Sequence, residues 1–236
     1  MNRILFEHDE IRDGVAVFGG ERAEHVLKIL HGEVGQPLKV GEVDGKIGTG
    51  EITAIAGGEI TVRVDLTDAA LPTWVDLILA PPRPRVMKRL LPQLATLGVG
   101  RLVLVGAKKV EKDFWGATLL QEANYRPLLV DGLMQAGTTE LPRLELRRGF
   151  RRFVADELET MFQTANRVVA HPYAAGAPSA DGRKEGRLLL AIGPEGGWTD
   201  DEVALLEEHG FARYSLGARI LRTDTAAIAL LAQLMK

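Results

Sequence analysis

The stretch AIGPEGGWTDDEV, residues 191–203, places three glycines and a proline directly after an apolar run. The run, RLLLAI at residues 187–192, is short and continuous, which is typical of a buried strand in a parallel sheet. Thr199 and Glu202 have the spacing of a capping box, so a helix is expected to begin there. In open α/β sheets, ligands bind beyond the carboxyl ends of the strands. The stretch therefore predicts a ligand-binding loop; a tight turn without a ligand is the alternative.

The glycine loop lacks the spacing of the usual phosphate-binding loops, GxGxxG or the P-loop. Glu195 within it also disfavours an anionic ligand. The same order of strand, glycine-bearing loop and helix is expected at the end of the chain, in YSLGARILRTDTAAIALLAQLMK at residues 214–236. There Gly217 ends an expected strand, and Thr223 or Asp224 is expected to cap the last helix. Two apolar loops with few cations suit a ligand with a flat base and its own positive charge, and S-adenosylmethionine fits that description better than ATP.

The first 70 residues are expected to form a small β-barrel. Segments 38–43, 48–57 and 59–66 alternate apolar and polar residues, with turns at Asp44-Gly45 and Gly57-Gly58. A short helix is predicted at residues 21–30. Pro72, within residues 68–74, marks the boundary with a second domain at residues 73–236.

The second domain is expected to be α/β, because apolar strands alternate with helical patterns along it. These elements imply a mostly parallel sheet covered on both faces. Strands are predicted at residues 75–80, 101–106, 167–170, 187–192 and 213–216, and helices at residues 85–98, 125–136, 152–163 and 223–235. A polar loop is predicted at residues 177–186.

Composition excludes several classes of protein. The 236 residues contain no cysteine, so neither disulfides nor a thiolate metal site can form, and the five histidines show no ligand spacing, so no metal is expected. No apolar run is long enough to span a membrane. The N-terminus carries acids where a signal peptide needs an apolar stretch, so a cytoplasmic protein is expected.

Charge is unevenly distributed. Residues 1–70 carry 7 Lys and Arg against 13 Asp and Glu, whereas the remainder carries 22 against 19. Residues 83–112 contain eight basic residues and one acid, and residues 143–152 contain five basic residues and one acid. Such clusters suit a polyanion such as RNA, and a solvated helix face is the alternative. The residues predicted to contact RNA are Arg3, Arg22, Lys28, Arg83, Arg85 and Arg89.

IGPEGGWTDDEV followed by SLGARILRTDTAAIALLAQLMK resembles the signature of the SPOUT superfamily, and within it the 16S ribosomal RNA uridine N3-methyltransferase family. HVLKILHGEVGQPLKV at residues 25–40 and KRLLPQLATLGVGRLVLV at residues 88–105 extend the resemblance over nearly the whole chain. The chain departs from the family pattern at Lys28, Thr96, Thr139 and Asp224, which makes it a divergent member.

The resemblance implies a PUA-like barrel that binds RNA, a SPOUT domain with a trefoil knot, and a homodimer acting on ribosomal RNA or the small ribosomal subunit. Arg222 is the catalytic candidate, because its charge can stabilise a developing negative charge on the base. The residues predicted to bind S-adenosylmethionine are Ile192, Gly193, Glu195, Gly196, Gly197, Leu216, Gly217, Ile220 and Leu221. Two alternatives stay open: methylation of another RNA nucleotide, and an RNA-binding homologue without catalysis.

Overall fold

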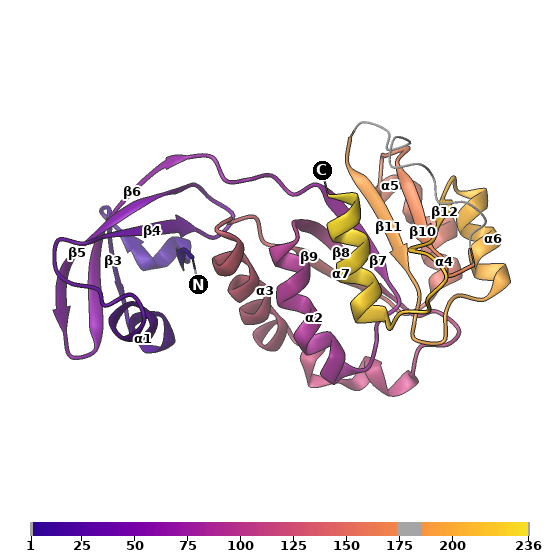
Figure 1. Ribbon diagram of the computed structural model, residues 1–236, viewed down its shortest axis with the longest axis horizontal. Helices are drawn as coiled ribbons and strands as arrows, with labels where there is room; N and C mark the ends of the chain where they lie inside the picture. Colours follow the sequence, from indigo (N-terminus) through magenta and orange to yellow (C-terminus); the bar gives the residue numbers. More distant parts are fainter. Residues whose placement is uncertain (1, 174–185, 236) are drawn as a thin grey trace. The chain divides into compact units, whose positions relative to one another are not determined.

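The computed structural model describes residues 2–173 and 186–235. The chain divides into two compact units, which Figure 1 shows with their elements labelled. The N-terminal unit comprises Met1–Pro72 and Leu129–Leu141, and the C-terminal unit comprises Thr73–Leu128 and Pro142–Lys236. The predicted polar loop at residues 177–186 lies, apart from Gly186, outside the described residues.

The N-terminal unit is built on a six-stranded sheet in the order β1-β4-β5-β6-β3-β2. Only the β1–β4 pair is parallel among these strands. Gly57 and Gly58, both at positive φ, make the tight turn between the two longest strands, as predicted. The elements are β1 (Ile4–Phe6), η1 (His8–Glu10), β2 (Ile11–Arg12), β3 (Val15–Phe18), α1 (Gly20–Lys28), β4 (Pro37–Glu42), β5 (Ile47–Ala56) and β6 (Glu59–Asp68). The curled sheet has β1 and β2 at its edges, and the PUA-like barrel stays a prediction.

The C-terminal unit contains a second six-stranded sheet, in the order β12-β10-β11-β7-β8-β9, and every neighbouring pair in it is parallel. This confirms the predicted parallel sheet; the trefoil knot stays a prediction. The strands are β7 (Val75–Leu79), β8 (Val99–Val105), β9 (Arg143–Arg147), β10 (Arg167–Ala170), β11 (Leu188–Ile192) and β12 (Ala212–Tyr214). The helices are α2 (Pro84–Thr96), η2 (Lys112–Gly116), η3 (Thr118–Leu120), α4 (Phe150–Asp156), α5 (Leu158–Met161), α6 (Asp200–Glu208) and α7 (Thr223–Leu234). Helix α3 (Glu122–Ala136) belongs to both units, because its residues from Leu129 onwards are part of the N-terminal unit.

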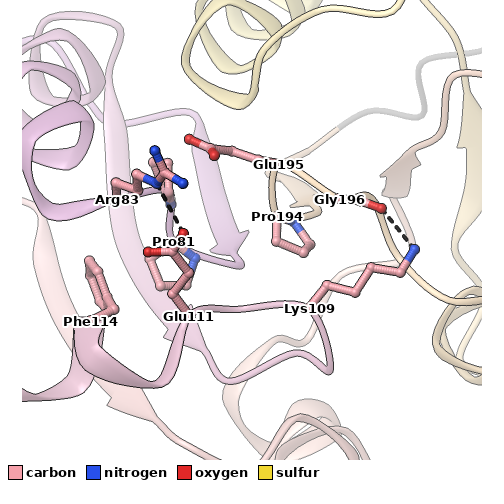
Figure 2. A pocket seen from close by; sticks show the side chains of 9 residues that line it. Pro81, Arg83, Lys109, Glu111, Phe114, Pro194, Glu195 and Gly196 are labelled. Carbon is pink, nitrogen blue, oxygen red and sulfur yellow. Dashed lines mark hydrogen bonds and ion pairs between the residues drawn. The ribbon is translucent and has the colours of Figure 1, made fainter.

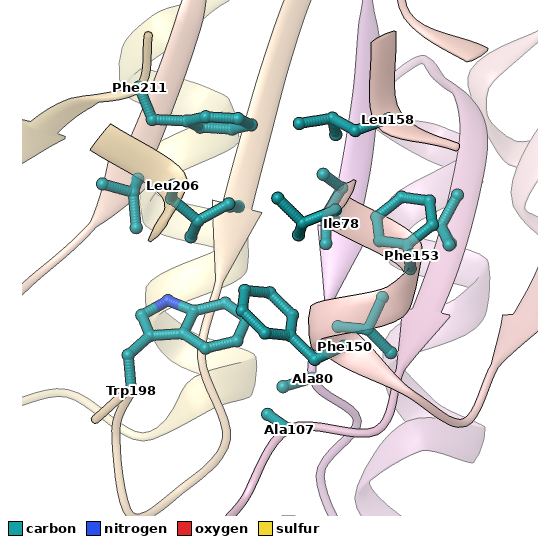
Figure 3. Close-up of a cluster of buried hydrophobic side chains, with 14 of the residues drawn as sticks. Ile78, Ala80, Ala107, Phe150, Phe153, Leu158, Trp198, Leu206 and Phe211 are labelled. Carbon is teal, nitrogen blue, oxygen red and sulfur yellow. The ribbon is translucent and has the colours of Figure 1, made fainter. Parts of the chain in front are cut away.

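Helices cover both faces of the parallel sheet. Figure 3 shows one face, where Ile78 and Ala80 pack under aromatic side chains from α4 and from the glycine loop. The rings of Phe150 and Trp198 lie 5.1 Å apart in this cluster. Helices α2 and α7 pack against each other, as Figure 1 also shows. Because alternate strand residues point to opposite faces, strand β7, in which all five residues are buried, is covered on both faces.

Three local predictions need correction. The basic run at residues 143–152 contains an edge strand, β9, whose alternating Arg143-Leu-Glu-Leu-Arg147 pattern the charge count had obscured. The helix predicted at residues 152–163 is two helices, interrupted at Glu157, whose carboxylate accepts a hydrogen bond from Arg147 Nε at 2.6 Å. The last helix is capped by Arg222 without a side-chain hydrogen bond, not by Thr223 or Asp224.

Candidate functional site

Three neighbouring strands at the centre of the parallel sheet, β11, β7 and β8, end at the same edge. The glycine loop at residues 193–197 follows β11, Pro81-Pro82-Arg83 follows β7, and residues 106–111 follow β8. This is the edge at which open α/β sheets bind ligands. Two cavities lie there, and both are lined by the glycine loop.

The larger cavity has a volume of about 460 Å³. All the residues predicted to bind the cofactor line it, so the two glycine loops do meet around one space. It is also lined by residues that the sequence reasoning had not assigned to it: Lys109, Ala170, Pro172, Tyr173, Pro194, Trp198, Asp200, Tyr214, Ser215, Arg219, Thr223, Ala226 and Leu230, together with His171.

The glycine loop is held by the buried carboxylate of Glu202. One oxygen accepts the backbone N–H of Thr199 at 2.9 Å, and the Thr199 hydroxyl accepts the N–H of Glu202, which confirms the predicted capping box. The other oxygen accepts the backbone N–H of Lys108 at 2.8 Å. A single carboxylate, 5% exposed, thus ties the loop after β8 to the start of α6.

The two glycine loops are also tied to each other. The Thr223 hydroxyl, at the start of α7, donates to the carbonyl of Gly193 at 3.4 Å. Lys109 Nζ donates to the carbonyl of Gly196 at 2.8 Å.

Glycine is favoured at two positions of these loops. A Cβ at Gly193 would lie 3.1 Å from Trp198, and Gly217 has φ +115°, a conformation that side-chain-bearing residues rarely adopt.

The charges around the larger cavity are mixed. Lys109 and Arg219 line it together with Glu195 and Asp200, so it is not a purely cationic anion site. His171, at the end of β10, has a pKa below its ordinary value, mainly because burial disfavours the charged ring. Trp198 Nε1 is buried and has no hydrogen-bond partner within the described residues.

The smaller cavity, about 170 Å³, is also lined by Pro194, Glu195 and Gly196 and is drawn in Figure 2. Arg83 Nε donates to the Glu111 carboxylate at 3.0 Å. The carboxylate of Glu195 points towards the Arg83 guanidinium. The pKa of Arg83 is raised, chiefly by its hydrogen bond to Glu111 and by the negative charges of Glu111 and Glu195. This arrangement was not predicted from the sequence, although Arg83 does follow a buried strand.

The residues predicted to contact RNA are used in different ways. Arg3 donates to the backbone carbonyls of Val40, Gly48 and Gly137, and Arg22 pairs with Glu10. Both are therefore engaged within the N-terminal unit.

The remaining charged candidates lie closer to solvent. Lys28 pairs with Glu24 one helical turn away. Arg85 and Arg89 are exposed on α2 and make no ion pair in the part of the chain that the structure describes. Arg222 is exposed between Leu221 and Thr223, which line the larger cavity, but it is not itself a lining residue of either cavity.

A family model of an RNA methyltransferase domain matches residues 69–235. The chain belongs to the RNA methyltransferase family. A relative from Treponema pallidum, named ribosomal RNA small subunit methyltransferase E, is 29% identical over 236 residues, covering 97% of this chain and 88% of the relative. Ribosomal RNA small subunit methyltransferase E 1 of Borreliella burgdorferi is 23% identical over 241 residues, covering 97% of this chain and 95% of the relative.

Solved structures show the same fold. A protein from Legionella pneumophila, in complex with S-adenosylmethionine, has a TM-score of 0.77 and 25% identity, with 99% of this chain and 96% of that chain covered. Ribosomal RNA small subunit methyltransferase E from Neisseria gonorrhoeae, bound to S-adenosylmethionine, has a TM-score of 0.77 and 22% identity, with 98% and 95% covered. The cofactor expected from the sequence is thus the one that both of these proteins carry.

Residues 2–173 and 186–235 contain neither a membrane-spanning helix nor a cluster of metal ligands. No helix there has the length and apolar character needed to cross a membrane. No group of three or more His, Cys, Asp or Glu side chains in these ranges is placed to hold a metal ion.

Proposed function

We propose that this RNA methyltransferase transfers a methyl group from S-adenosylmethionine to N3 of a uridine in 16S ribosomal RNA. The observation that carries the proposal is the meeting of the two glycine loops around one cavity at the carboxyl edge of the parallel sheet. The names of the relatives support the ribosomal RNA substrate. The uridine N3 position rests on the sequence resemblance.

The larger cavity fits the cofactor in size and chemistry. Its volume of about 460 Å³ lies within the usual range of roughly 300–1,000 Å³ for small-molecule sites. Leu216, Ile220 and Leu221 offer apolar walls for a flat base, and the glycines leave backbone groups accessible. Glu195 and Asp200 supply negative charge near a ligand that carries a positive one.

When bound, S-adenosylmethionine supplies a methyl group attached to a positively charged sulfur. The chain's own residues then have two tasks: to orient the target base, and to stabilise the negative charge that its ring develops as the N3 proton leaves. Arg222 is proposed for the second task. Its neighbours Leu221 and Thr223 line the cavity while its own side chain is exposed, so it can meet an RNA base arriving from solvent.

The proposal includes a homodimer in the cytoplasm. Helix α7 buries Ala227, Leu230 and Leu231 within its own unit, but Ile228 is 40% exposed and Met235 is 47% exposed. A partner subunit covering this strip would remove apolar surface from water. Sedimentation at micromolar concentration should give a dimer, and Ile228→Asp should shift it towards monomer; a wild-type monomer would contradict this part of the proposal.

The function is tested by binding and by mapping. Calorimetry should give micromolar affinity for S-adenosylmethionine, on the order of −7 to −8 kcal/mol. Ribosomal RNA from a deletion strain should lack one N3-methyluridine, and the purified protein should restore it on small subunits. Restoration of a different modified nucleotide would favour the first alternative function. Cofactor binding without any methylation would favour the RNA-binding homologue.

A further inference from the structure

The smaller cavity has the size of one six-membered ring. Its volume is about 170 Å³, and an engineered protein cavity of roughly 150 Å³ is known to bind benzene. Pro81, Pro82 and the buried Phe114 give it apolar walls. A volume of this size accommodates a single pyrimidine ring.

The smaller cavity adjoins the proposed cofactor cavity. Lys109, Pro194, Glu195 and Gly196 line both of them. A base in the smaller cavity would therefore lie next to the ligand of the larger one. This is the relation that a methyl donor and a methyl acceptor require.

A hydrogen-bond donor and a hydrogen-bond acceptor both line the smaller cavity. Figure 2 shows the Glu195 carboxylate directed at the Arg83 guanidinium, yet the two do not form an ion pair within the described residues. Glu111 holds Arg83 through Nε, which leaves the terminal N–H groups of the guanidinium for another partner. The gap thus offers a hydrogen-bond donor beside a hydrogen-bond acceptor.

The edge of uracil complements this pair. Uracil presents a carbonyl oxygen next to the N3–H group, so Arg83 can donate to the carbonyl while Glu195 accepts from N3–H. Cytosine has no hydrogen on N3, and its acceptor there would face the carboxylate. The arrangement therefore selects a uracil ring by hydrogen bonding.

We propose that the smaller cavity holds the target uracil, with Glu195 as the proton acceptor and Arg83 as the residue that binds the adjacent carbonyl. The inference rests on the function proposed above and adds the place where the target base binds and the residues that act on it. The N3–H bond breaks and its proton passes to the Glu195 carboxylate. The nitrogen electron pair forms the new N–CH₃ bond, the S–CH₃ bond breaks, and its electrons neutralise the sulfonium. Glu111 is a positioning residue, because it acts by holding Arg83.

Other charged groups surround Glu195 and belong in any account of its pH dependence. Around the smaller cavity these are Arg83, Lys109 and Glu111. The larger cavity adds His171, Asp200 and Arg219. Because burial lowers the pKa of His171, His171→Gln should accompany each pH profile.

The first test is the pH–rate profile of Glu195→Gln in single-turnover methylation of small subunits. Loss of a general base should lower the rate by about 10²–10⁴-fold near neutral pH. The variant then depends on uridine that has ionised by itself, so its rate should rise about tenfold per pH unit, more steeply than wild type. Glu208→Gln is the matched control, because Glu208 is exposed at the end of α6 and makes no ion pair among the described residues. A wild-type rate and slope in Glu195→Gln would overturn the assignment.

The second test needs no turnover. Uridine 5′-monophosphate, titrated by NMR in the presence of S-adenosylhomocysteine, should shift the amides of Phe114 and Glu195. Arg83→Ala should weaken this binding roughly tenfold or more, because a hydrogen bond to a charged group is lost, and cytidine 5′-monophosphate should bind wild type less well. Shifts confined to the larger cavity would overturn the inference.

The two tests separate failure of the inference from failure of the proposed function. A wild-type protein that methylates uridine while Glu195→Gln behaves as wild type would refute only the inference. A wild-type protein that methylates no uridine would refute the function, and the titration would still decide whether the smaller cavity binds a uracil ring.

Discussion

In the N-terminal unit, Arg3 and Arg22 donate to backbone carbonyls of their own unit, whereas in the C-terminal unit Arg85 and Arg89 stand exposed on α2 without an ion pair among the described residues. The first unit is also the acidic one, with 7 Lys and Arg against 13 Asp and Glu in residues 1–70. Its few arginines are thus partly used to hold the fold together. The two basic clusters, at residues 83–112 and 143–152, both lie in the C-terminal unit. The following predictions test this division.

The largest effect is expected at Arg222, an exposed arginine of the C-terminal unit. Arg222→Ala should lower single-turnover methylation by ~10²–10³, roughly 2.7–4 kcal/mol, if its charge acts only in the transition state. Cofactor affinity and the melting temperature should stay near wild type. Arg222→Lys should rescue little, because an ammonium lacks the planar fork of a guanidinium. A lower melting temperature with nearly intact turnover per folded molecule would instead make Arg222 a structural residue.

Arg22, an arginine of the N-terminal unit, should contribute to the stability of the protein and not to methyl transfer. Its guanidinium donates to the Leu5 carbonyl and pairs with Glu10, and it lies 5.7 Å from the ring centroids of Phe6 and Phe18. Arg22→Ala should lower the free energy of unfolding by about 1.5–3 kcal/mol in urea titrations. Arg12→Ala is the matched control, because Arg12 is exposed in the same unit and makes no ion pair among the described residues, and it should change stability by no more than about 0.5 kcal/mol. An unchanged free energy of unfolding in Arg22→Ala would instead favour the predicted role of Arg22 in RNA contact.

The exposed cations of α2 should carry the salt dependence of RNA binding. Arg89→Gln should reduce the slope of log affinity against log salt by about 0.7–0.9, the effect of one lost phosphate contact. Arg213→Gln removes the same charge from the same unit, but Arg213 is already paired with Glu207 at 2.7 Å. It should change the slope less. Equal slopes in both variants would mean that α2 is only a solvated face.

The sequence predicted the larger cavity well because each of its two loops carries its own signature. Residues 193–197 and 216–221 each contain glycine and each follow a strand of the parallel sheet, so both loops could be placed at the same edge of the sheet. Strand β11, before the first loop, is buried, whereas β12, before the second, is exposed at Ala212 and Arg213. The same rule could have found Pro81-Pro82-Arg83, which follows the neighbouring strand β7. It was missed because two prolines and an arginine resemble no ligand-binding motif.

Other features could not be read from the sequence because they depend on distant partners. Arg3 bonds to the carbonyl of Gly137, which is 134 positions away, and Glu202 bonds to the N–H of Lys108, which is 94 positions away. A charge count treats all of these residues as surface. It also hid strand β9, where the arginines alternate with leucines at the edge of the sheet.

The smallest effect is expected at an acid-sensitive ion pair of the C-terminal unit, in which the arginine is already paired with a carboxylate. The side chain of Arg167 is 9% exposed and pairs with Glu159 at 2.7 Å, and His209 also lies 3.0 Å from Glu159. Hydrogen bonds from Arg167 and then His209 lower the pKa of Glu159 to about 2 from 4.5. Since the folded pKa is the lower one, the stabilisation is present above about pH 4.5 and is lost as the pH falls towards 2.

The size of this pH effect is limited by solvent, because the Glu159 side chain is 57% exposed. Glu159→Gln should therefore lower the free energy of unfolding by only about 0.2–1 kcal/mol at pH 7. The difference from wild type should shrink as urea titrations are repeated from pH 5 downwards. Glu208→Gln, which removes an exposed carboxylate with no ion pair among the described residues, should show no such convergence. If the difference in the free energy of unfolding grows below pH 4.5, its sign does not fit a lowered pKa. That result would contradict a stabilising pair between Glu159 and Arg167.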